Sequence, residues 1–306
     1  MTLKGMSEIL GKEIKLTDVQ VKEDCASLGE YLQKFDLPVE CLQTREGLKK
    51  AAFDFLMDLQ KDQIKYVEVR FAPQLSAHPG LSCKKVMEAV LDGLEAAKEQ
   101  CGIFYEVIAC MMTHHEEETN LQMLKECREF LGEGLCAVDL AGDESAFPRK
   151  KFYPLFETAK RMDYPFTIHS GECGNADHIL MAAEWGASRI GHGIAMMGCP
   201  EVQKVIAKKR IGVEMCPISN YQTKALQPGT TYPIREFAAA GIPVTINTDN
   251  RLVSNTTIRK EMCFLHENFG ITEEELREYQ FHAIDTAFCD DAVKHTMWKL
   301  LQSENS

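Results

Sequence analysis

The chain has 306 residues, of which 45% are hydrophobic and 26% charged, and its formal net charge at pH 7 is −12. This length and composition fit an ordinary soluble globular protein with a sizeable core, built as one large α/β domain or two small ones. The acidic charge argues against a general binder of nucleic acid, because such a protein needs a basic face for the phosphates.

No apolar run reaches the length of a bilayer span, and the first residues, MTLKGMSEILGKEIK, are too polar for a signal-peptide core. We therefore expect a cytoplasmic protein with no membrane partner. The 12 cysteines are scattered without a C-x-x-C pair, and several lie in apolar runs. In that compartment we expect mostly reduced thiols that pack as small hydrophobic side chains.

Helices are expected first along the chain, over residues 1–10, 28–35 and 45–61. Short apolar runs then alternate with amphipathic stretches, which is the pattern of βα units around a parallel sheet. Seven strands are expected, at residues 66–71, 104–111, 135–140, 165–169, 188–191, 211–216 and 243–248. Intervening helices include 82–100, with Ser82 as N-cap, 120–131, 154–161 and 199–208. Two more helices follow, over 256–269 and 272–288, the second opened by the capping box Thr272-Glu273-Glu274-Glu275.

No linker or internal repeat divides residues 1–306, so we expect a single domain. A doubly wound sheet would normally place a glycine-rich phosphate turn after its first strand, and no such motif occurs. In a TIM-type (β/α)8 barrel, function collects at the carboxyl ends of several strands. The sequence favours the barrel, because polar residues end the strands at Arg70, Asp139, His169, His192, Glu214 and Asp249.

The segment Thr167-Ile168-His169-Ser170-Gly171-Glu172 carries the strongest chemical signal. His169 ends a strand, so its side chain would enter the barrel mouth, and Glu172 follows on the next loop. A histidine ligand beside a non-ligating acid suits metal-assisted hydrolysis, because the metal activates water and the acid protonates a substrate nitrogen. Taken alone, the segment fits equally well a hydrogen-bonded histidine and a solvent-facing glutamate.

Two further strand ends carry complementary groups. His192 lies between Gly191 and Gly193, which let the backbone approach a ligand closely. Asp249 follows an apolar run, where a buried carboxylate is costly unless it is paired or metal-bound. The alternatives are a turn histidine and an N-cap aspartate. Three strand ends with complementary groups favour a shared site.

Other residues are expected at the same mouth. Gly142 could offer its backbone N–H to a ligand, and Asp139 could orient its neighbours, although a plain βα turn is the alternative. Ser219 and Asn220 are candidate polar wall groups. The pair His114-His115 is expected to lie on the loop surface.

In combination and order, these motifs resemble the adenosine deaminase family, part of the metal-dependent amidohydrolase barrels. The likeness runs from about Cys25 to the C-terminus. Its segments are residues 24–25, 32–36, 66–73, 139–144, 167–172, 191–193, 216–217 and 247–250. The resemblance implies a zinc hydrolase of purine metabolism that converts adenosine or 2′-deoxyadenosine to inosine or 2′-deoxyinosine and ammonia.

Residue by residue, the resemblance implies that His169 and Asp249 are ligands of Zn2+, with one ion per chain. It implies that Glu172 is the acid that protonates the purine ring nitrogen. It implies that His192 positions and deprotonates the attacking water.

The purine nucleoside itself is the expected small-molecule partner. Gly142 matches a backbone contact to the purine. Asn250 stands where many family members have a second aspartate that contacts the purine, and an amide can still hydrogen-bond there.

The sequence departs from the family at its start. The family opens with a strand ending in H-x-H, whose histidines are zinc ligands, and no H-x-H occurs in these 306 residues. We therefore expect a barrel with the first strand missing, N-terminally truncated relative to the family. The gap would be filled by residues 1–21 as a surrogate strand, by a lid, or by a partner subunit in a homo-oligomer.

Two functions follow from this departure. The first is hydrolytic deamination, with His114 or His115 as replacement ligands in one version. The second is a non-catalytic purine-nucleoside-binding or assembly protein derived from an adenosine deaminase.

Overall fold

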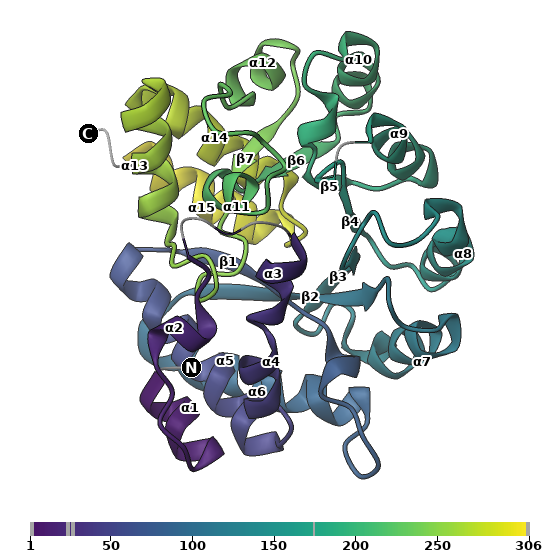
Figure 1. Cartoon of the computed structure of the whole chain (residues 1–306), viewed down its shortest axis with the longest axis vertical. Coiled ribbons are helices and arrows are strands. Elements are labelled where there is room, and N and C mark those ends of the chain that lie inside the picture. The colour runs from purple at the N-terminus through teal and green to yellow at the C-terminus, as the bar shows by residue number, and fades with distance from the viewer. Residues whose placement is uncertain (1–2, 23–24, 26–27, 174, 304–306) are drawn as a thin grey trace.

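Seven parallel strands form the centre of the chain in a computed structural model that describes residues 3–22, 25, 28–173 and 175–303 (Figure 1). One hydrogen-bonded group contains β1 (Tyr66–Phe71), β2 (Phe104–Met112) and β3 (Leu135–Ala141). The other contains β4 (Thr167–Ser170), β5 (Arg189–His192), β6 (Gly212–Met215) and β7 (Val244–Ile246). A bridge between Val138 and Phe166 joins the two groups. All seven predicted strands are confirmed.

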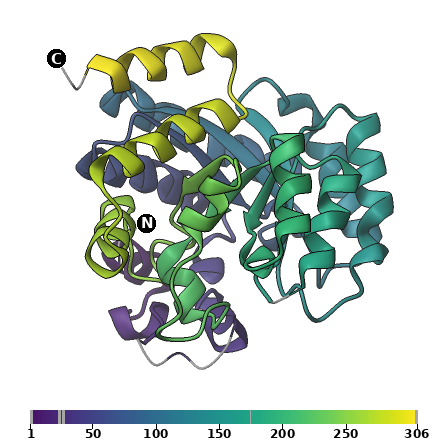
Figure 2. The ribbon, with the colours of Figure 1, turned by 90° about the horizontal axis from the view of Figure 1, so that it is seen from above.

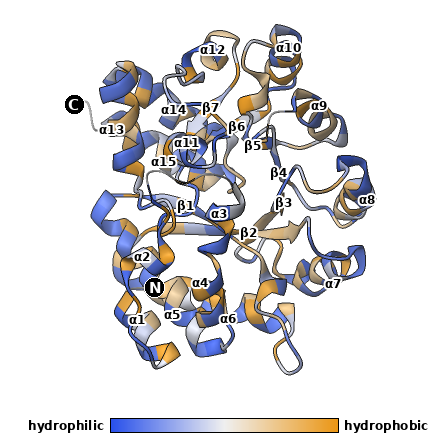
Figure 3. Cartoon of the chain, viewed as in Figure 1, coloured by the Kyte–Doolittle hydropathy of each residue, from blue (hydrophilic) through white to orange (hydrophobic). Residues whose placement is uncertain are grey.

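Helices connect the strands and cover the outside of the strand layer (Figure 1). They are α6 (Cys83–Cys101), α7 (Glu117–Cys127), α8 (Tyr153–Arg161), α9 (Ala176–Trp185), α10 (Pro200–Lys209) and α12 (Ile234–Ala239). Parallel neighbours require such crossovers, and each helix buries an apolar stripe against the strands. Figure 3 shows both hydrophilic and hydrophobic faces on these helices. The TIM-type arrangement of alternating strands and helices is confirmed.

Local signals define several helix ends. The Ser82 side chain accepts a hydrogen bond from the backbone of Lys85, which confirms it as the N-cap of α6. The capping box between Thr272 and Glu275 opens α14 (Glu273–Thr286), as predicted. Helix α13 (Ile258–Phe269) precedes it, and α15 (Asp291–Ser303), which was not predicted separately, lies beside it (Figure 2).

The barrel is not closed by hydrogen bonds. Strand β1 pairs only with β2, and β7 pairs only with β6, in the part of the chain that the structure describes. All six residues of β1 are partly exposed, whereas β3 is almost fully buried. The free edges of β1 and β7 are the two edges that a missing strand would leave.

The N-terminal region is helical. It forms α1 (Leu3–Leu10), α2 (Leu16–Val19), α3 (Leu28–Gln33) and α4 (Asp36–Cys41), and α5 (Arg45–Leu59) follows. The proposed surrogate strand in residues 1–21 is wrong for the described residues, because Leu16 and Val19 belong to a helix. Val19 instead packs with Met6, Ile14 and Cys41 in a small separate core.

Charged side chains alternate across the interior of the barrel. The order is Glu68, Arg189, Glu214, Arg70, Asp139 and His169. Arg189 Nε lies 2.7 Å from Glu214, and Arg70 lies 2.5 Å from the other oxygen of the same carboxylate. Buried charges need partners of this kind, because an isolated ion loses its hydration. The chain of ion pairs ends at His169, on the side where the strands end.

The apolar core lies between the strands and the outer helices. Most of the cysteines are buried, as predicted for packing thiols. None of the helices in the described part of the chain has the length and apolar character needed to cross a membrane.

Candidate active site

His169 is oriented by a buried carboxylate. Its Nδ1 lies 2.7 Å from Asp139 on β3, and a carboxylate only accepts, so Nδ1 carries the hydrogen and Nε2 is left for another partner. Burial alone would lower the pKa of His169, but the charge of Asp139 outweighs it and raises that pKa. Burial likewise opposes ionisation of Asp139, yet His169 and Arg70 hold the pKa of that carboxyl well below its usual range. Asp139 therefore takes the orienting position expected for it.

Glu172 points toward His192. Its carboxylate is buried and accepts a hydrogen bond from Thr223 Oγ1 at 3.0 Å, while its other oxygen lies 3.6 Å from His192 Nε2. Thr223 follows α11 (Pro217–Gln222), the short helix after β6. Nothing in the pattern of the sequence pointed to Thr223, because the loop geometry brings it there.

His192 ends β5 in a left-handed backbone conformation, with φ of 65°. Such a φ is uncommon for a residue other than glycine and is found often at functional sites. Its ring lies 5.2 Å from the ring of His169, so the two strand ends meet as predicted.

The hydrogen-bond partners of His192 define which ring nitrogen carries hydrogen. Tyr232 donates to Asn220 Oδ1 at 2.8 Å, so the amide nitrogen of Asn220 is the group 2.9 Å from His192 Nδ1. An amide N–H donates, so Nδ1 accepts and Nε2 carries the hydrogen in the neutral ring. His192 thus presents a donor on the side of Glu172.

Asp249 lies three residues beyond β7 and is held by hydroxyl groups. Its Oδ2 accepts a 2.7 Å hydrogen bond from Ser219 Oγ, and Tyr31 OH lies 3.4 Å away. Tyr31 belongs to α3 and is also bonded to Ser254. Burial, followed by the charge of Asp249, raises the pKa of Tyr31 well above its ordinary value, so the phenol stays neutral. Tyr31 was not anticipated from the sequence.

Gly142 and Asn250 lie on the loops that follow β3 and β7. Gly142 has φ of 109°, and a Cβ there would lie 2.5 Å from Thr113 Oγ1, so a side chain is excluded. Asn250 uses its oxygen to accept a 2.9 Å hydrogen bond from the backbone of Val253, which leaves its amide nitrogen as a donor. Their contacts to a purine stay predictions.

The donor set does not match a catalytic zinc site. Within the described residues, no group of three or more His, Cys, Asp or Glu side chains is placed to hold a metal ion. Catalytic zinc normally has three protein ligands besides water. The replacement role for His114 or His115 gains no support, since these rings pack on each other at 4.5 Å. His169 and Asp249 are two candidate ligands, and the described residues place no third one beside them.

The chain is similar in sequence to adenosine deaminases. The family model described as adenosine deaminase matches residues 12–303. The adenosine deaminase of Clostridium botulinum (strain Kyoto / Type A2) is 39% identical over 281 residues, covering 91% of this chain and 84% of that protein.

Solved structures share the fold. A Zn-bound amidohydrolase from Burkhoderia ambifaria superposes with a TM-score of 0.89 at 18% identity, covering 99% of this chain and 85% of that one. Arabidopsis ADAL in complex with IMP superposes with a TM-score of 0.87 at 24% identity, covering 98% and 91%.

Proposed function

The chain belongs to the adenosine deaminase family, and from this premise we propose that the strand-end site hydrolyses the amino group of adenosine or 2′-deoxyadenosine. The products are inosine or 2′-deoxyinosine and ammonia. The named relatives support adenosine deamination as the reaction. The single observation that carries the proposal for this site is the meeting of Glu172 and His192, 3.6 Å apart, beside His169.

Glu172 is the proposed proton donor to the purine ring. Its buried carboxyl keeps one oxygen on Thr223, while the other faces His192. A positioned acid lowers the barrier because the ring nitrogen gains its proton as the attacking oxygen forms its bond to carbon. Burial of the group excludes competing water from this transfer.

His192 is the proposed group that positions the attacking water. The family resemblance also assigns it the removal of the water proton. In the hydrogen-bond pattern with Asn220, however, Nδ1 is already an acceptor and Nε2 already bears hydrogen. This pattern favours donation from His192 to the reacting oxygen. Once Glu172 has given its proton to the ring nitrogen, its carboxylate is free to take up the proton that the attacking water loses.

Gly142 and Asn250 are the proposed purine contacts. Gly142 has no side chain to screen its backbone, and Thr113 leaves no room for one. The amide nitrogen of Asn250 can donate a hydrogen bond to a ring nitrogen of the purine. The ligand class is a small-molecule purine. The IMP complex of the Arabidopsis protein is a nucleotide complex, so a phosphate on the ribose is a variant to be tested beside the nucleoside.

Zinc is the metal implied by the family and by the Zn-bound relative. When bound in such a site, zinc supplies an activated water. The described residues contribute His169 and Asp249 but no third ligand, so they do not fit a complete catalytic centre. We assign no step of the reaction to the metal.

Substitution of Glu172 tests the catalytic proposal. We expect Glu172→Gln to lower kcat for adenosine by at least about a hundred-fold and to change adenosine binding far less, since the proton matters most in the transition state. Glu184→Gln, at an exposed position on α9, is the control. Equal losses in kcat and in binding would contradict the acid role.

A purine-nucleoside-binding or assembly protein without catalysis is the second candidate. It is favoured by the lack of a three-ligand metal group among the described residues. Adenosine binding without any turnover by the wild-type chain would support it over the enzyme.

A further inference from the structure

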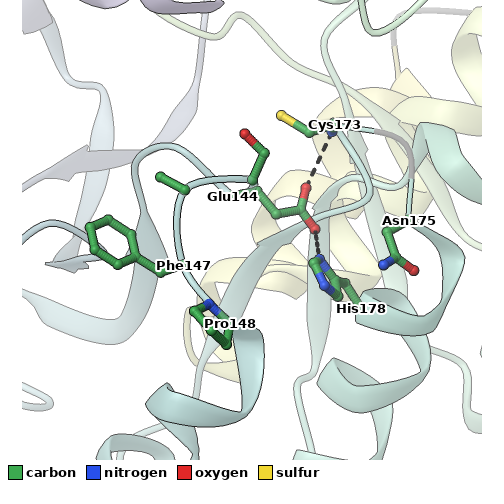
Figure 4. Close-up of a pocket in the computed structure, with 8 residues that line it drawn as sticks. Glu144, Phe147, Pro148, Cys173, Asn175 and His178 are labelled. Atoms are coloured by element: carbon green, nitrogen blue, oxygen red, sulfur yellow. Dashed lines mark hydrogen bonds and ion pairs between the residues drawn. The ribbon is translucent and has the colours of Figure 1, made fainter.

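A buried carboxylate outside the candidate site holds the loop that carries Glu172. Glu144, on the loop after β3, is 5% exposed. It accepts three successive backbone N–H groups, from Gly171 at 2.8 Å, Glu172 at 3.0 Å and Cys173 at 3.3 Å. Figure 4 shows Glu144 between Cys173 and His178.

Three consecutive N–H groups that converge on one anion form a backbone nest. Gly171 makes this possible with φ of 75°, which turns the chain directly after β4. A Cβ at Gly171 would lie 2.6 Å from Ile179 Cδ1 and 3.1 Å from Ala195 Cβ, so the turn strongly favours glycine. The nest that follows the metal-ligand candidate His169 is thus filled by a side chain of the protein.

Two cationic or donor side chains complete the arrangement. Arg149, 3% exposed, lies 3.6 Å from Glu144 and donates to Ser170 Oγ at 3.1 Å and to the backbone oxygen of His169. His178 Nδ1 lies 2.8 Å from Glu144 and must be the donor to a carboxylate. Burial opposes ionisation, but Arg149, the Gly171 N–H and His178 together lower the pKa of Glu144.

The Glu144 carboxylate and its partners (the N–H groups of residues 171–173 and the side chains of Arg149 and His178), together called the clamp, border a cavity. A cavity of about 540 Å3 is lined by Glu144 and by neighbours that include Phe147, Cys173 and His178 (Figure 4). If the carboxylate is lost, water from this cavity can compete for the three N–H groups. The backbone of residues 171–173 would then no longer be held in a single conformation.

We propose that Glu144 is a positioning residue for Glu172, with Arg149 tying the same clamp to the end of β4. The catalytic side of this inference rests on the proposed role of Glu172. The structural side does not, because it concerns the backbone of residues 171–173 alone.

Backbone hydrogen exchange tests the clamp directly. Glu144→Gln leaves one oxygen for three N–H groups and sets an amide NH2 against the others. We expect exchange at the amides of residues 171–173 to speed up at least about ten-fold, because a buried acceptor has been lost. Glu236→Gln is the matched control, since Glu236 also accepts a loop N–H, from Gly198 at 2.7 Å. Unchanged exchange at residues 171–173 would overturn the proposal.

Glu144→Asp provides a second variant should Glu144→Gln fail to fold. It keeps the charge beside Arg149 but shortens the side chain by one carbon. We expect exchange intermediate between wild type and Glu144→Gln. If Glu144→Gln is unfolded while Glu144→Asp is folded and its amides at residues 171–173 exchange as slowly as in wild type, Glu144 contributes to overall stability only. That outcome would overturn its positioning role.

Binding of inosine, the reaction product, tests whether Glu144 acts through Glu172. We expect Glu144→Gln to weaken inosine binding about ten-fold in the wild-type background and less than about two-fold beside Glu172→Gln, since residues in one network are not additive. Equal weakening in both backgrounds, with normal folding, would overturn the coupling. If the wild-type chain binds neither inosine nor adenosine, the proposed function fails, and hydrogen exchange alone decides the clamp.

Discussion

At the scale of single residues, the candidate site depends on neighbouring side chains that fix which ring nitrogen of His169 and of His192 carries hydrogen. Asp139 leaves Nε2 of His169 free, and Asn220 assigns the hydrogen of His192 to Nε2. Tyr232 holds Asn220 in the required orientation. Such partners matter because the two nitrogens of an imidazole differ in role, and one hydrogen bond decides between them.

Asn220→Asp tests this assignment. The carboxylate keeps the size of the amide and still accepts from Tyr232, but it cannot donate to Nδ1 of His192. We expect the 15N spectrum of His192 to show hydrogen on Nδ1, where the wild type shows it on Nε2. Adenosine turnover should fall at least about ten-fold, as is typical when a catalytic imidazole loses its orientation.

Asn268→Asp, on the exposed end of α13, is a control for adding one negative charge. An unchanged His192 spectrum in Asn220→Asp would contradict the tautomer assignment.

At the scale of elements, α13 and α11 are joined by a buried acid. Glu261 of α13 is fully buried and accepts from the backbone of Ile218, in α11, at 2.9 Å and from Thr256 Oγ1 at 2.7 Å. Burial raises the pKa of Glu261 to about 7, although these two donors partly offset it. Helix α11, which carries Ser219 and Asn220, therefore packs on a group that changes charge near neutral pH.

This pKa predicts how stability changes with pH. The folded state binds the Glu261 proton more tightly than the unfolded state, so its contribution is complete below the ordinary pKa and is lost as pH rises toward 7. One pKa unit is about 1.4 kcal/mol, so the loss is on the order of 3 kcal/mol. We expect the free energy of unfolding of Glu261→Gln to fall less between pH 5 and pH 8 than that of wild type.

Chemical denaturation at pH 5 and pH 8 measures the free energy of unfolding of both proteins. Any destabilisation by the Glu261→Gln substitution that does not depend on pH cancels when the two pH values are compared. Glu267→Gln, exposed on the same helix, should follow wild type. A parallel pH dependence in Glu261→Gln and wild type would contradict the raised pKa.

At the scale of the whole molecule, the open edges of β1 and β7 lie in the same barrel as the incomplete donor set. Ion pairs cross the interior and reach His169 through Arg70 and Asp139. A network of paired charges keeps its geometry because each buried ion would be costly without its neighbours. A homo-oligomer that covers the strand edges stays a prediction.

Metal content tests the completeness of the site. We expect the purified 306-residue chain to retain well below one zinc per chain after dialysis, since two protein ligands are fewer than catalytic zinc normally has. Elemental analysis gives the stoichiometry, and Asp249→Asn is the comparison for residual binding. One tightly held zinc per chain would contradict this expectation and indicate a ligand beyond those identified in the described residues.

Local sequence patterns predict the order and type of most helices and strands. Apolar runs such as Leu135–Ala141 predict buried strands because parallel strands hide both faces, and Ser82 and Thr272 mark helix starts through local hydrogen bonds. The polar strand ends His169, His192 and Asp249 are also predicted from the sequence, because a polar or charged group after a buried strand needs a hydrogen-bond partner or a ligand. Each of these signals lies within a few neighbouring residues.

Which distant side chains come into contact depends on the tertiary fold. The contact of Glu172 with Thr223, the bond from Asn220 to His192 and the clamp of Glu144 on residues 171–173 join segments of different βα units. The helical form of residues 16–19 was likewise misjudged, because packing against Cys41 outweighs a weak alternation of apolar residues. Local patterns record which face of an element is buried, whereas the partners on that face follow from how the whole chain packs.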